Sequence, residues 1–156
     1  MVAIAAEERR PAIGRIRMAT ISNASQSSLH QFVQEVVDPG STIHTDAWSG
    51  YPKLGGEGYQ HKVSNISRSG RPAHEVMPRV HLVAGLLKRW LLGTHQGGFA
   101  AQHLDYYPDE FTFRFNRRRS RSRGKLFRRL LEQAVEVPPA RYGTIVHGIL
   151  NPLTQT

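Results

Sequence analysis

The stretch SSLHQFVQEVVDPGSTIHTD, residues 27–46, decides the fold class of this chain. Its first half carries apolar side chains at the three- and four-residue spacing that buries one face of a helix. These are Leu29, Phe32, Val33, Val36 and Val37. The Asp-Pro-Gly run at 38–40 ends that helix. Residues 41–45 are short and rich in β-branched side chains, which indicates a strand.

Further strands are predicted on both sides of this stretch. Residues 2–6 form a short apolar run, and residues 15–21 alternate between apolar and polar side chains, so the two predict a hairpin around the turn at 11–14. Residues 59–65 favour another strand, and residues 67–78 are predicted to be an exposed, mobile connector. Strands, a helix between strands and then helices predict an α/β layered domain.

The second half of the chain is predicted to be helical. A core-facing stripe runs through Leu82, Val83, Leu86, Leu87, Trp90 and Leu91. Gly93 is expected to stop this helix. Residues 104–115 suggest a helix interrupted by Pro108, although the alternating phenylalanines there also suit a strand. Residues 126–135 form a last amphipathic helix, which ends at 137–139.

Length and composition narrow the class of protein. A chain of 156 residues predicts one domain. It contains no cysteine, which excludes thiolate zinc sites, cysteine nucleophiles and iron–sulfur clusters. Its apolar runs are far shorter than the ~20 residues of a membrane span. The sequence therefore predicts a soluble, cytoplasmic domain with no membrane partner.

The positive charge is concentrated in residues 114–129, which we call the basic segment. The chain has 21 Lys and Arg against 12 Asp and Glu, a formal net charge of +9. The bases of the segment, which contains no acid, are Arg114, Arg117, Arg118, Arg119, Arg121, Arg123, Lys125, Arg128 and Arg129. Such a block favours a polyanion, and arginine pairs with phosphate through two donors. The alternative is a disordered solubilising stretch, but large apolar side chains flank the block closely. Nucleic acid is the predicted partner.

Three residues are candidates for chemistry. Asp46 follows the predicted strand 41–45, where a carboxylate can ligate a metal or simply cap a turn. His81 and Lys88 lie seven residues apart, so they project from the same face of one predicted helix. Imidazole can ligate a divalent metal and an ammonium can hold a phosphate oxygen, although a lone surface histidine is the simpler interpretation.

Three separated motifs resemble the ISXO-type insertion-sequence transposases of the DDE superfamily. The first is TDAWSGY at 45–51. The second is Lys88-Arg89 followed by Gly93-Thr94-His95, and the third is YYPDEFTFRFNRR at 106–118, with Pro108 where the family prefers leucine. The resemblance covers about residues 2–135.

The resemblance implies a ribonuclease H-like fold, a mixed sheet flanked by helices, with acidic residues around two Mg²⁺ (or Mn²⁺) ions. Such enzymes cut the transposon end and join it to target DNA. Asp46 matches the second acidic position, and His81 stands where the family has Glu or Asn, so both are implied metal ligands. Lys88 matches a lysine that contacts DNA. The full implied DNA-binding set is Lys88, Arg89, Arg114, Arg117, Arg118, Arg119, Arg121 and Arg123.

The first acid of the family lies on a strand upstream of the part that residues 2–6 resemble. We therefore expect a core fragment over 1–137 that lacks its first strand, a tail over 138–156, and an incomplete two-metal site. The chain is expected to be an insertion-sequence transposase that is inactive in this form. One alternative is a DNA-binding remnant that cuts nothing, and another is an unrelated RNA-associated basic protein. Nucleoid association and a homodimer are further expectations.

Overall fold

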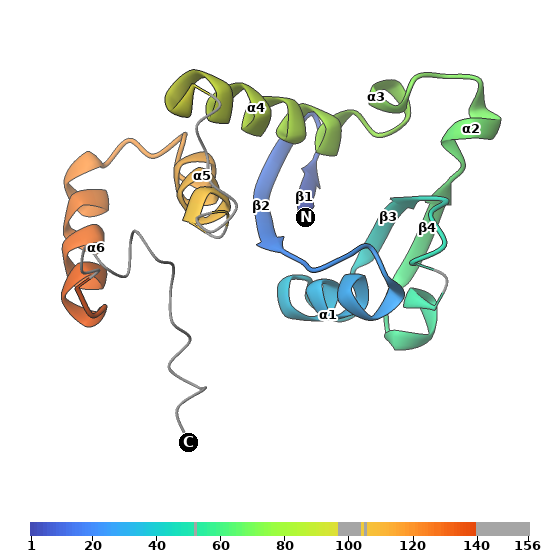
Figure 1. Cartoon of the computed structure of the whole chain (residues 1–156), viewed down its shortest axis with the longest axis horizontal. Coiled ribbons are helices and arrows are strands. Elements are labelled where there is room, and N and C mark those ends of the chain that lie inside the picture. The colour runs from blue at the N-terminus through green and yellow to red at the C-terminus, as the bar shows by residue number, and fades with distance from the viewer. Residues whose placement is uncertain (52, 97–103, 105, 140–156) are drawn as a thin grey trace.

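The computed structural model confirms the α/β class (Figure 1). It describes residues 1–51, 53–96, 104 and 106–139. The strands are β1 Val2–Arg9, β2 Ala12–Thr20, β3 Thr42–Asp46 and β4 Gln60–Ser64. The helices are α1 Gln26–Val36, the 3₁₀ helix η1 Leu54–Glu57, α2 Ile66–Ser69, α3 Ala73–Val76, α4 Pro78–His95, α5 Tyr106–Asn116 and α6 Arg123–Glu136.

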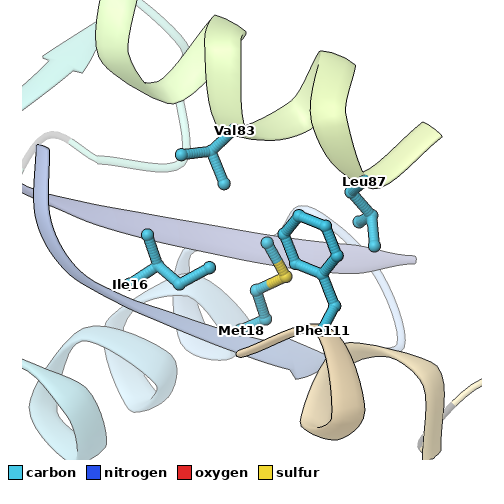
Figure 2. Packing of buried hydrophobic residues seen from close by; sticks show 5 residues of the cluster. All are labelled: Ile16, Met18, Val83, Leu87 and Phe111. Carbon is cyan, nitrogen blue, oxygen red and sulfur yellow. The ribbon is translucent and has the colours of Figure 1, made fainter. Parts of the chain in front are cut away.

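The predicted hairpin is confirmed as the antiparallel pair β1–β2. Ile4 lies opposite Met18 and Ala6 opposite Ile16, so these side chains share one face of the hairpin. α4 packs against β1 and α5 against β2. Figure 2 shows the buried cluster between these elements, in which the side chains from β2, α4 and α5 converge. Its members are Ile16, Met18, Val83, Leu87 and Phe111.

The other two strands form a separate parallel pair, with Asp46 of β3 opposite Ser64 of β4. A second buried cluster of Val33, Leu54 and Tyr59 packs α1 against this pair and η1. The described strands therefore form two two-stranded sheets in place of the single mixed sheet that we expected.

The side chain of Asn116 covers part of one edge of the hairpin sheet, at Ile16 of β2. The backbone N–H of Ile16 donates to Asn116 Oδ1 at 2.7 Å, and Asn116 Nδ2 donates to the Ile16 carbonyl at 2.9 Å. The last residue of α5 thus occupies both backbone groups that a further strand would need at this point of β2. The hairpin is covered here by a helix instead of being extended by a strand.

The prediction for residues 67–78 is confirmed in part: the segment is largely exposed, but it contains the short helices α2 and α3. The Asn65 side chain accepts a hydrogen bond from the Arg68 backbone at 3.0 Å and starts α2, and Gly70 ends it with φ of 64°. Pro72 then precedes α3. Asn65 and Gly70 cap α2, whereas α3 has no side-chain cap, and neither helix buries its side chains.

Two details of the long helices also differ from expectation. α4 continues past Gly93 to His95, since a glycine costs a helix only about 1 kcal/mol and the apolar stripe extends to Leu91. Residues 106–116 are helical, which excludes the alternative strand. Pro108 is tolerated because it lies in the first turn, where its missing N–H would have no partner.

The ends of the structure add two findings. α6 confirms the predicted last helix, and only positions 138 and 139 of the predicted tail belong to the described residues. None of the helices formed by the described residues is long and apolar enough to cross a membrane.

Candidate functional site

Asp46 is the last residue of β3 and is half-buried. Its backbone carbonyl accepts a hydrogen bond from the hydroxyl of the buried Thr45 at 2.8 Å. Its Oδ1 accepts from the Trp48 backbone N–H at 3.2 Å, and within the described part of the chain Oδ2 has no hydrogen-bond donor. The carboxylate is therefore held at the end of a strand with one oxygen available.

Side chains on β4 reinforce the strand that presents Asp46. Thr42 donates to Gln60 at 3.1 Å, and His44 Nε2 lies 2.7 Å from Ser64 Oγ. Thr42 and Gln60 lie directly opposite each other, whereas His44 and Ser64 are diagonal neighbours, since Ser64 lies opposite Asp46. These contacts stiffen β3 along its length up to the candidate site.

His61 on β4 contacts Thr45, the residue that precedes Asp46 on β3. Its Nε2 lies 2.8 Å from the Thr45 hydroxyl. Because that hydroxyl gives its one hydrogen to the Asp46 carbonyl, it must accept from His61, so the Nε2 of His61 carries the proton. Burial, and to a smaller extent the neighbouring His30, lowers the pKa of His61. A neutral His61 is therefore the form that fits this arrangement near pH 7.

The loop after Asp46 folds back onto the start of α1. Trp48 Nε1 donates to the Ala24 carbonyl at 3.0 Å. Gly50 is buried, and a Cβ added there would lie 2.6 Å from Leu29 Cδ1 and 3.0 Å from the Ala24 carbonyl oxygen. The tryptophan and the glycine of the 45–51 motif therefore have packing roles that fix the position of Asp46.

Tyr51 lies near Asp46, and the His30–Glu57 pair lies near His61. Burial and the negative charge of Asp46 raise the pKa of Tyr51, so its hydroxyl stays protonated. The buried His30 on α1 places its Nδ1 2.5 Å from Glu57 Oε1, and its Nε2 has no partner among the described residues. Sequence patterns could not find His30, Glu57 and His61, because they come from three elements and share no spacing motif.

His81 and Lys88 are both exposed on α4, and their seven-residue spacing places them on the same face of this helix. Gly85 lies between them on the same row, while Val83 and Leu87 face the core. α4 packs on β1 and α3, and no extensive contact links it to β3. Among the described residues, no hydrogen bond or ion pair joins Asp46 to His81, and no group of three His, Asp or Glu side chains could hold a metal ion. Metal ligation by these two residues stays a prediction.

The first part of the basic segment is tied to the fold. Arg118 donates to the carbonyls of Ile13 at 2.5 Å, Phe115 at 2.8 Å and Gly14 at 3.4 Å. Its guanidinium also stacks on the Phe115 ring, 3.9 Å from the centroid. These contacts join the end of α5 to the hairpin. Arg118 is therefore engaged in structure as well as being a predicted DNA contact.

The rest of the basic segment has more freedom. Arg114 pairs with Glu110 at 2.7 Å and Arg128 with Glu132 at 2.8 Å. Five exposed bases have no acidic partner within the described residues: Arg119, Arg121, Arg123, Lys125 and Arg129. The two remaining arginines of the segment are Arg118, which is tied to the fold as described above, and Arg117.

The guanidinium of Arg117 stacks on the Phe113 ring, 3.8 Å from the ring centroid. Burial, together with the positive charges of Arg129 and Arg15, lowers the pKa of Arg117. The positive charge of Arg129 thus disfavours the charged form of Arg117. A polyanion would relieve this repulsion.

A comparison with known protein families assigns most of this chain to one family. A family model of insertion-sequence transposase domains matches residues 1–116, from β1 to the end of α5. The chain belongs to this family, the ISXO2-like transposase domain, within the DDE superfamily. No curated protein and no solved structure gives a significant match. The resemblance read from the three sequence motifs is thus confirmed at the level of the family.

Proposed function

We propose that this chain takes part in transposition by binding the DNA of an insertion sequence, its ends and its target, through the basic segment. The observation that carries this proposal is the group of exposed bases at 119–129 that lacks acidic partners among the described residues. Phosphate oxygens are the ligands that such arginines fit best. Membership of a transposase family supports DNA as the polyanion.

The second part of the proposal concerns the fold. A ribonuclease H-like arrangement of the core, residues 1–137, is supported by the antiparallel hairpin, the helix α1 and the strand that ends in Asp46. Asp46, His81 and Lys88 would then lie in the catalytic centre. Lys88 and Arg89, both exposed on α4, would contact DNA beside it.

The transposase family implies a two-metal site, for which this chain offers Asp46 and His81. Mg²⁺ prefers carboxylate oxygens, and Asp46 offers one such group, whereas the imidazole of His81 suits Mn²⁺ better. Since no three ligating side chains are grouped in the described part of the chain, the residues do not fit a complete two-metal site. We therefore propose that the chain by itself binds DNA without cutting it.

The test is the salt dependence of DNA binding, measured by fluorescence anisotropy with a labelled duplex. If about half of the basic segment contacts phosphates, log K against log salt falls with a slope of roughly −4. The double variant Arg119→Glu/Arg121→Glu should weaken binding about a hundredfold or more, while Arg68→Glu on α2 serves as a matched exposed control. A flat salt dependence contradicts the DNA-binding proposal, and tighter binding to structured RNA than to duplex DNA supports the RNA-associated alternative.

Cleavage is tested separately with supercoiled plasmid and Mg²⁺ or Mn²⁺. We expect no nicking above that of Asp46→Asn, which keeps the hydrogen-bonding shape of the loop but removes the charge. Metal-dependent nicking that Asp46→Asn abolishes would show an active site in this chain and overturn the proposal that it does not cut. Loss of nicking in His81→Ala as well would assign His81 to that site.

A further inference from the structure

α6 has an apolar face that nothing in the described structure covers. Its apolar side chains are exposed, with exposed fractions of 64% for Phe127, 47% for Leu130 and 52% for Leu131. Figure 1 shows α6 standing apart from the hairpin, α4 and α5, and α6 makes no extensive contact with another described element. A helix of about 21 Å with such a face gains its stability from a partner that buries it.

The charges at the two ends of α6 are opposite to those that stabilise an isolated helix. Arg123 and Lys125 lie in the first turn, where the helix dipole is positive, and no acid accompanies them. Glu136 closes the last turn, where the dipole is negative, and no base accompanies it. Ser122 makes no side-chain capping bond. Each end of α6 therefore gains from a neighbouring helix end of opposite sign.

These two features identify the partner as a second α6 in antiparallel orientation. Antiparallel pairing places the basic first turn of one helix beside the acidic last turn of the other, and it opposes the two dipoles. It also places Leu130 near the twofold axis of an isologous interface, because residue 126 of each helix then faces residue 134 of the other. A parallel pair would bring like charges together at both ends.

The other apolar surface in the described residues does not suit α6. It is a groove between α4, α5 and the hairpin turn, lined by Leu82, Leu86, Trp90 and Phe115. Arg114, Arg118 and Arg119 stand around it. These arginines would repel the basic first half of α6, so charge separates this site from the antiparallel pair.

We propose that α6 is the homodimerisation element of this chain and forms an antiparallel two-helix interface with α6 of a second copy. The seam consists of Leu126, Phe127, Leu130, Leu131 and Ala134. α6 lies beyond residues 1–116, which match the transposase family, so the interface is a property of this chain rather than of the matched domain. It depends on apolar burial and does not rest on the proposed DNA binding.

Sedimentation equilibrium on nucleic-acid-free protein tests the proposal. We expect a dimer at about 100 μM, which is the range of a small interface. Leu130→Glu should raise the dimer dissociation constant about a hundredfold or more, since it places two buried charges at the centre of the seam. Val63→Glu is the matched control, because Val63 is 51% exposed and lies on β4, outside α6. Circular dichroism of both variants checks that the chain remains folded.

A charge exchange tests the orientation. Arg123→Glu and Glu136→Arg should each weaken the dimer, and the double variant should recover most of the loss, because the exchanged charges again meet their opposites in an antiparallel pair. A monomeric wild-type chain at 100 μM overturns the proposal and indicates that α6 is covered within its own chain. A dimer that Leu130→Glu leaves intact overturns it as well, and failure of the double variant to recover contradicts the antiparallel orientation.

Discussion

The loop after β3, residues 46–51, and the basic segment, residues 114–129, both carry motifs that led to the transposase family, yet they are built in opposite ways. In the loop, Trp48 bonds to Ala24 and Gly50 has no room for a side chain. In the basic segment, most of the charged side chains are exposed, and only some have a partner. Motif residues of the loop are therefore required for packing, whereas the bases of the segment at 119–129 that have no acidic partner among the described residues remain available to a ligand.

The largest effect on stability that this comparison predicts concerns two glycines. Gly50→Ala should lower the free energy of unfolding by about 2–3 kcal/mol, because its Cβ meets the Leu29 side chain and the Ala24 backbone. Gly124→Ala in α6 meets nothing within 4 Å, so it should raise helix stability by up to about 1 kcal/mol. Urea unfolding of both variants measures the difference. Equal effects would mean that the loop is not tightly packed.

A smaller loss is expected for Thr45→Val, which preserves shape and removes the hydroxyl. The Nε2–H of His61 then loses its acceptor, and we expect a cost of about 1–2 kcal/mol. Thr42→Val, at an exposed position of the same strand, is the control and should change stability little. Chemical denaturation of the two variants decides whether the His61 contact stabilises the strand below Asp46.

The adjacent residues Arg118 and Arg119 separate a structural role from a binding role within the basic segment. Arg118→Ala removes three hydrogen bonds to backbone carbonyls and should cost about 1 kcal/mol of stability. Arg119→Ala should leave stability unchanged and weaken DNA binding, since Arg119 is exposed and has no acidic partner in the described structure. Thermal unfolding and anisotropy titrations on the same samples separate these outcomes. The reverse pattern would exchange the roles of the two residues.

The smallest effect expected is a pH dependence from His61. Because its pKa is lowered in the folded state, the unfolded state binds more protons, so the contribution of His61 is complete above about pH 6.5 and is lost as the pH falls towards the folded pKa. His61→Asn keeps a donor for Thr45 and should flatten the stability profile between about pH 5 and 7. Identical slopes for wild type and variant would exclude His61 as a source of pH dependence.

Local patterns predicted the elements of this fold well, and their assembly poorly. The apolar spacing of α1 and α4 and the alternation of β2 located these elements, because burial on one face leaves a period in the sequence. The separation into two sheets could not be read, since strand pairing depends on contacts between residues far apart in the sequence. Distant contacts of this kind leave no periodic signal.

The candidate site divides in the same way. Asp46 and the shared exposed face of His81 and Lys88 were accessible to sequence reasoning, because strand ends and helical spacing are local. The contacts that hold Asp46 were not, since the His61–Thr45 bond and the Trp48–Ala24 bond join residues 16 and 24 positions apart. The pairing of Arg118 with backbone carbonyls was equally hidden within a run of similar charges.

The bond between Asn116 and Ile16 also bears on how the chain avoids aggregation. A hairpin strand with free backbone groups can pair with a strand of another molecule, and a side chain that occupies those groups prevents such pairing. This protection comes from a residue near the end of the matched domain. During synthesis the hairpin therefore emerges long before Asn116. In this interval its free backbone groups can pair with a strand of another nascent chain.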